Sequence, residues 1–162
     1  MDKFPITQQG YDKLEQEIKQ LKHVERPTII EAIATAREFG DLSENAEYHA
    51  AREKQSFIEG RILDLEDKFS RAEIIDTSKL STDSVKFGAT VKVIDDDTEE
   101  ESTYHIVGEY EADITKKRIS TKSPLAKALI GKSIGDIVEV TTPKGGKAFE
   151  IIEISFQNFK LD

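Results

Sequence analysis

The chain has 162 residues, of which 37% are hydrophobic and 34% charged, and its net charge is −9 at neutral pH. This length suits one ordinary domain or two small ones, and the acidic balance argues against binding nucleic acid through bulk electrostatics. Without cysteine there is no disulfide framework and no thiolate ligand or nucleophile. No apolar run is long enough to cross a membrane. We therefore expect a cytoplasmic protein with a charged surface.

The first part of the chain, residues 7 to about 75, has the apolar spacing of helices. Apolar side chains recur every three or four positions, at Tyr11, Leu14, Ile18 and Leu21. The pattern resumes with Ile29, Ile30, Ile33 and Ala36. Between these segments Pro27 removes a backbone donor, so we predict a kink or a short break there. Thr7 is the predicted N-cap of the first helix.

A second apolar stripe follows a break near Gly40. It alternates spacings of four and three, at Tyr48, Ala51, Gln55, Ile58, Ile62, Leu65, Phe69 and Ala72. Such alternation is typical of a coiled-coil seam. Because two such segments are available to pair, we predict an antiparallel hairpin whose arms are about 50 Å long, at roughly 1.5 Å per residue. A helix from another chain could also cover the seam, but we expect a monomer.

Two carboxylates, Asp41 and Glu44, lie at the break between the stripes. Gly40 is a natural helix C-cap, since glycine adopts the left-handed conformation without a Cβ penalty. Asp41 followed three residues later by Glu44 fits a variant of the capping box, so one interpretation is capping of the second helix. In the other interpretation, acidic groups at the tip deliver a metal ion to a site on another molecule.

The second half of the chain has the pattern of a small domain built on strands. Residues 77–84 are polar and unpatterned, which predicts a linker between a hairpin at 1–76 and a globular domain at 85–162. Four strands are predicted, at residues 90–94, 103–107, 137–141 and 148–154. The fold class is therefore α+β, with an antiparallel helical hairpin followed by a mostly antiparallel sheet.

The remaining sequence patterns predict a turn and a short helix, and none of them indicates an active site. A turn is predicted at residues 143–146, and Ser123 with Pro124 begins a short helix. The sequence from Gly131 to Ser133 resembles the end of a phosphate-binding loop, but Ala126 stands where the earlier glycine is required. The three histidines, His23, His49 and His105, lack the spacing of a metal pair.

Several segments match one known family. Residues 7–17 match its opening pattern, residues 36–53 give the longest and most specific match, and the second half matches at residues 87–91, 106–108 and 123–132. On these segments the whole chain resembles the Gre family of bacterial transcript-cleavage factors, and within it the A type. The resemblance implies a coiled-coil hairpin followed by a domain similar to the FK506-binding-protein fold.

The resemblance also implies a function that depends on RNA polymerase. In that family the globular domain docks beside the secondary channel, and the hairpin brings its tip to the polymerase active site. The polymerase then hydrolyses the RNA of a backtracked complex, so the chain itself is predicted not to be an enzyme. Asp41 and Glu44 match the two tip acids, which would help to hold a second Mg²⁺ jointly with the polymerase and position the attacking water.

Four further residues take roles from the resemblance. Arg37 and Arg52 match the basic patch that contacts the nascent RNA 3′ segment, although solvated surface charges are the alternative. Ser123 and Pro124 match the polymerase-docking region, with helix capping as the alternative. Lys122 precedes them where some relatives carry an acid or an amide, which leaves the docking contacts open.

Three rival functions compete with this hypothesis. One is a related inhibitor that occupies the channel without supporting cleavage, but the tip matches the cleavage type. Another is a coiled-coil chaperone or peptidyl-prolyl isomerase, which would need an aromatic-lined pocket in a C-terminal half that has no tryptophan and few aromatic residues. The third is a purely structural coiled coil.

Overall fold

The computed structural model describes residues 2–77 and 80–156, and the chain divides into two units. One unit comprises residues 1–2 and 12–72, and the other comprises residues 3–11 and residues 73 onward. The second unit therefore includes two segments that the sequence assigns to the hairpin. The predicted linker includes residues 78–79, and the predicted globular domain includes residues 157–162; both stretches lie outside the described residues.

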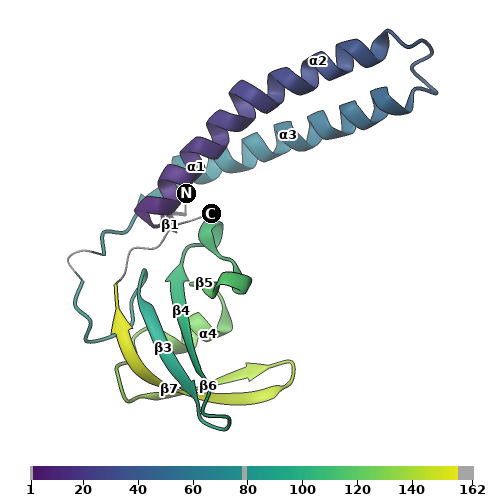
Figure 1. Cartoon of the computed structure of the whole chain (residues 1–162). Helices are drawn as coiled ribbons and strands as arrows, with labels where there is room; N and C mark the ends of the chain where they lie inside the picture. The colour runs from purple at the N-terminus through teal and green to yellow at the C-terminus, as the bar shows by residue number, and fades with distance from the viewer. Residues whose placement is uncertain (1, 78–79, 157–162) are drawn as a thin grey trace. The chain divides into compact units, whose positions relative to one another are not determined.

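The first unit is a helical hairpin (Figure 1). Its first arm consists of α1 (Gln8–Gln20) from residue 12 onward, a π-helical turn η1 (Leu21–Glu25) and α2 (Arg26–Arg37). Its second arm is α3 (Ala46–Arg71). The apolar seam between the arms buries Leu14, Leu21, Ile29, Ile33, Ala36, Ile58, Ile62 and Leu65. The predicted antiparallel pairing of two heptad-patterned helices is confirmed.

The ends and the interruption of the first arm follow the local sequence. Thr7 caps α1, because its Oγ1 accepts the backbone N–H of Gly10 at 3.0 Å. The irregularity expected near Pro27 takes the form of η1, after which Pro27 occupies the first turn of α2. Ile30 is 52% exposed, in contrast to the apolar role predicted for it. Successive helical residues point about 100° apart, so the inward direction of Ile29 turns Ile30 outward.

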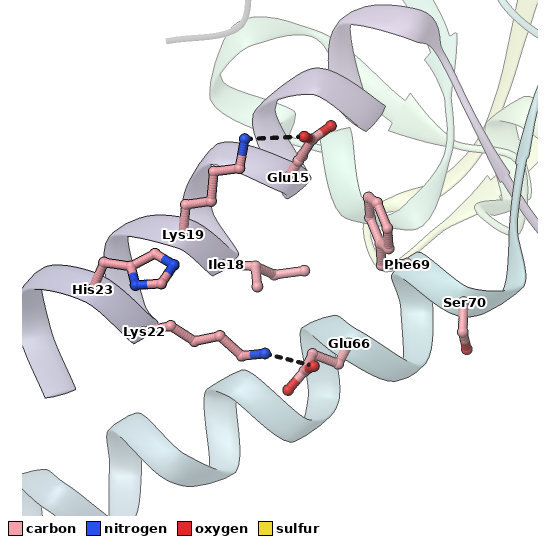
Figure 2. Close-up of a pocket in the computed structure, with 8 residues that line it drawn as sticks. All are labelled: Glu15, Ile18, Lys19, Lys22, His23, Glu66, Phe69 and Ser70. Carbon is pink, nitrogen blue, oxygen red and sulfur yellow. Dashed lines mark hydrogen bonds and ion pairs between the residues drawn. The ribbon is translucent and has the colours of Figure 1, made fainter.

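Ion pairs between the arms flank the seam. Arg26 donates twice to Glu59, with both nitrogen–oxygen distances 2.8 Å, and Arg61 Nη2 lies 3.0 Å from Glu17 Oε2. Beside η1 the surface is hollowed over Ile18 and Phe69 (Figure 2). The pairs Lys19–Glu15 at 3.1 Å and Lys22–Glu66 at 2.9 Å border this hollow.

The second unit contains a five-stranded sheet in the order β5-β4-β3-β7-β6 (Figure 1). Its strands are β3 (Thr90–Asp95), β4 (Glu101–Val107), β5 (Arg118–Ser120), β6 (Ile137–Thr142) and β7 (Gly145–Ser155). The β4–β5 pair is parallel and the other pairs are antiparallel. Helix α4 (Pro124–Leu129) buries Ala126 and Leu129 in the same core as Val91, Val93 and Ile151.

The four predicted strands are confirmed, and the elements of three residues were not predicted. Two three-residue strands, β1 (Phe4–Ile6) and β2 (Ala72–Ile74), form a separate two-stranded sheet. The prediction that the helix continues to about residue 75 is therefore wrong. Two 3₁₀ turns, η2 (Glu109–Glu111) and η3 (Ile114–Lys116), precede β5. No helix within the described residues has the length and apolar character to cross a membrane.

Candidate functional site: the tip of the helical hairpin

The tip is the loop between α2 and α3. Helix α2 ends at Arg37, and the N–H of Phe39 bonds to the carbonyl oxygen of Ala36 at 3.2 Å. Gly40 then has φ +107°, with open space where a Cβ would lie. Glycine adopts a positive φ without the steric cost that a Cβ imposes on other residues. Gly40 therefore lets the chain turn sharply away from the helix. The expectation of a left-handed glycine after the first arm is confirmed, two residues past the C-cap Glu38.

Asn45, rather than Asp41, caps the second arm. Its Oδ1 accepts the N–H of Tyr48 at 3.0 Å, and its Nδ2 donates to the carbonyl oxygen of Ala36 at 2.7 Å. The capping interpretation of Asp41 with Glu44 is therefore wrong. The physical reason is that α3 begins only at Ala46, so residues 41–44 form a turn of their own before the helix.

Asp41 organises that turn. Its Oδ1 accepts the Oγ–H of Ser43 at 2.8 Å and the N–H of Ser43 at 3.0 Å. These two hydrogen bonds, the side-chain one first, hold the pKa of Asp41 below its usual value, so the carboxylate is ionised at neutral pH. The N–H of Glu44 bonds to the carbonyl oxygen of Asp41 at 3.3 Å, and both acidic residues are exposed. One turn of backbone thus carries two exposed carboxyl groups.

Arg37 and Arg52, the predicted RNA-contacting residues, both lie beside the ring of Tyr48. The sequence placed Tyr48 only in the helical seam. The guanidinium carbons of Arg37 on α2 and Arg52 on α3 each lie 5.9 Å from the ring centroid of Tyr48. Arg52 Nη1 also donates to the Tyr48 hydroxyl at 3.1 Å. The two guanidinium groups hold the pKa of Tyr48 below its ordinary value, and Arg37 has the largest effect. Burial of the hydroxyl opposes them.

His49 connects this group to the acidic turn. Its Nε2 lies 3.2 Å from the carbonyl oxygen of Ser43, the residue that binds Asp41. Its ring packs edge-on against Tyr48, with centroids 5.6 Å apart and planes inclined at 66°. The carbonyl oxygen can only accept, so Nε2 is the donor in this geometry. Helical spacing could not predict this contact, because Ser43 lies in the loop before α3.

The tip carries carboxylates, which are the kind of ligand that Mg²⁺ prefers. Mg²⁺ prefers carboxylate oxygens and keeps several of its waters, so one or two carboxylates are a usual protein contribution. Over residues 2–77 and 80–156, no group of three or more His, Asp or Glu side chains is placed to hold a metal ion.

The predicted docking residues belong to the other unit. Ser123 Oγ accepts the N–H of Ala126 at 3.2 Å and so caps α4. Pro124 is the first residue of that helix and is exposed. The predicted helix start is confirmed, and the Ser123 hydroxyl is engaged in it.

Comparison with known proteins covers both halves of the chain. A family model for the N-terminal part of transcription elongation factors matches residues 4–74, and a model for the C-terminal part of GreA/GreB factors matches residues 80–156. Transcription elongation factor GreA of Rickettsia prowazekii is 70% identical over 159 residues, covering 98% of each chain. GreA of Rickettsia canadensis is 69% identical with the same coverage. The crystal structure of Thermus aquaticus Gfh1 aligns at 29% identity, with a TM-score of 0.45, covering 95% of this chain and 99% of that one.

These matches define the class as transcription elongation factors. The chain belongs to the GreA/GreB family. The resemblance carried by residues 7–17 and 36–53 is thereby confirmed, and the rival functions are not favoured.

Proposed function

We propose that this chain binds RNA polymerase and stimulates the polymerase's own Mg²⁺-dependent cleavage of backtracked nascent RNA, so that arrested complexes resume elongation. Family membership supports the proposal, and one observation carries it. The exposed tip holds an ionised Asp41 beside Glu44, yet the described residues include no complete metal site. One or two carboxylates are a usual protein contribution to a Mg²⁺ site, so this pair is suited to completing a site on a partner.

In this proposal Asp41 and Glu44 hold the second Mg²⁺ together with the polymerase. When bound, that ion would supply part of the positive charge with which two metal ions assist an in-line phosphodiester hydrolysis. Ser43 fixes the Asp41 side chain through two hydrogen bonds, and Asn45 fixes the loop between the helices. A carboxylate oxygen of either acid can also accept a hydrogen bond from the attacking water and orient it.

The remaining residues serve binding. Arg37 and Arg52 offer guanidinium groups to phosphates of the nascent RNA 3′ segment. The second unit, for which we propose a fold like that of the FK506-binding proteins, docks on polymerase through the region of Ser123 and Pro124. We propose that the chain acts as a monomer and is not itself a nuclease.

The direct test uses a backtracked elongation complex with labelled RNA. Adding the protein with Mg²⁺ should release a short 3′ fragment and restore elongation, whereas the protein should leave free RNA intact. If it slows elongation without releasing a fragment, the inhibitor hypothesis replaces this one. If it neither binds nor affects polymerase, the proposed function is wrong.

A further inference from the structure

The side chain of Tyr48 lies between cationic groups from both arms of the hairpin. Arg37 is the last residue of α2, and Arg52 is one turn after Tyr48 on α3. Each guanidinium carbon is 5.9 Å from the ring centroid. Groups stacked in contact would lie roughly 3.5–4 Å apart, and cation–π attraction extends to about 6 Å. Both arginines therefore sit at the outer limit of that attraction.

These two arginines differ from the others in their partners. The chain has six arginines, and four of them pair with carboxylates, namely Arg26 with Glu59, Arg61 with Glu17, Arg71 with Asp67 and Arg118 with Asp113. Within the described part of the chain, Arg37 and Arg52 pair with no carboxylate. On a protein of net charge −9, two uncompensated cations beside one aromatic ring form a local basic site.

We propose that Tyr48, flanked by Arg37 and Arg52, is a stacking site for one base of the single-stranded RNA 3′ segment. This inference rests on the proposed function and adds a base contact to it. Single-stranded RNA is bound by aromatic rings and guanidinium planes that stack on bases, with cations that neutralise the adjacent phosphates. Tyr48 combines these features in the first turn of α3, directly after the loop that carries Asp41 and Glu44.

The location gives this contact a purpose. Asn45 Oδ1 accepts the N–H of Tyr48 and ties its backbone to the end of the acidic loop. A base stacked on the ring would therefore be held at a fixed position relative to the acidic turn. Holding a flexible strand in one position beside a reacting group is a recognised source of rate enhancement. Tyr48 would act as a positioning residue, while the acids act on metal and water.

A fluorescence experiment tests the stacking directly in the backtracked elongation complex. The RNA carries 2-aminopurine at one extruded position at a time, and stacking on an aromatic ring quenches its emission. The parent protein and Tyr48→Phe should quench one position, and Tyr48→Leu, which keeps an apolar seam residue, should not. If the parent leaves every position unchanged, or Tyr48→Leu quenches like the parent, the proposal is overturned.

A double-mutant cycle separates stacking from a structural role of Tyr48. An abasic nucleotide at the quenched position should slow cleavage with the parent protein about tenfold, within the range for one base–aromatic stack. With Tyr48→Leu the same RNA change should have no further effect. If the two losses multiply, Tyr48 is only structural and the proposal fails. If the parent stimulates no cleavage of intact RNA, it is the proposed function that fails.

Discussion

The side-chain amide of Asn45 donates to the carbonyl oxygen of Ala36 at 2.7 Å, joining the last turn of α2 to the start of α3. The same side chain caps α3 through its Oδ1. One residue thus closes the tip and determines where the second helix begins. The loop that remains, residues 38–44, is the one that displays Asp41 and Glu44.

Replacing Asn45 should weaken both the hairpin and its activity. Asn45→Ala loses the cap and the bond to Ala36, so we expect the free energy of unfolding to fall by about 1–2 kcal/mol. Stimulated cleavage should fall as well, because the acidic turn loses its anchor. Asn45→Asp keeps the capping oxygen and lacks the donor, so its stability should be intermediate. Denaturation followed by circular dichroism measures the stability, and equal stability of all three proteins would contradict this role.

Replacing glycine by alanine should have opposite effects on stability at two helical positions, Gly10 and Gly60. A Cβ at Gly10 would collide with the Glu111 carboxylate, whereas a Cβ at Gly60 would meet nothing within 4 Å. Gly10→Ala should therefore destabilise the protein by about 1–3 kcal/mol, since Glu111 must leave its hydrogen bonds. Gly60→Ala should stabilise α3 by up to about 1 kcal/mol, the difference in helix propensity.

Thermal and chemical unfolding of the two glycine variants under identical conditions checks this pair. The Gly60 variant controls for the general effect of replacing glycine by alanine in a helix. Equal shifts of the same sign would show that the carboxylate of Glu111 does not occupy the space beside Gly10.

Glu111 predicts a particular pH dependence of stability. It is only 4% exposed and accepts the N–H groups of Thr7 at 2.9 Å and Gly108 at 3.3 Å. Burial raises the pKa of Glu111, and the backbone hydrogen bonds with Thr7 and Gly108 oppose that effect only in part. Its contribution to stability is therefore complete below the unfolded pKa, about 4.3, and is lost as pH rises through the folded pKa.

Comparison with Glu111→Gln isolates this contribution. Glutamine does not titrate, so the stability of the parent relative to the variant should be greatest at acidic pH and decrease as pH rises. Denaturant titrations at several pH values, beginning near pH 4, measure the difference. A difference that grows with pH would mean that the ionised carboxylate is favoured in the folded state, contrary to this account.

The helical seam could be predicted from the sequence because the position of a residue along a helix determines the face on which its side chain lies. Ile58, Ile62 and Leu65 are buried as their heptad positions require. Of the two interpretations of the tip, capping by Asp41 with Glu44 is the one that is wrong, because α3 begins after Asn45 and not after Asp41. The choice between these two helix starts depends on Ala36, nine residues earlier, which accepts a bond from Asn45. Local pattern does not contain that contact.

Long-range packing explains the features that sequence analysis missed. Glu111 reads as an ordinary surface acid, yet it is buried by residues more than one hundred positions away, among them Thr7. The strands β1, β2 and β5 have three residues each, too few to establish an alternating pattern. Tyr48 fitted the seam by spacing, and its two arginine neighbours became visible only when the arms were paired.

The central claim is that the charge of Asp41 acts on the shared metal, and Asp41→Asn tests it most directly. Asparagine keeps an oxygen that can accept both bonds from Ser43, so the turn should be preserved while the charge is lost. In backtracked complexes at limiting Mg²⁺, we predict that stimulated cleavage falls about 10²–10⁴-fold. The variant should still compete with the parent protein for polymerase. Full cleavage by Asp41→Asn at limiting Mg²⁺ would contradict the account, because the turn alone would then suffice.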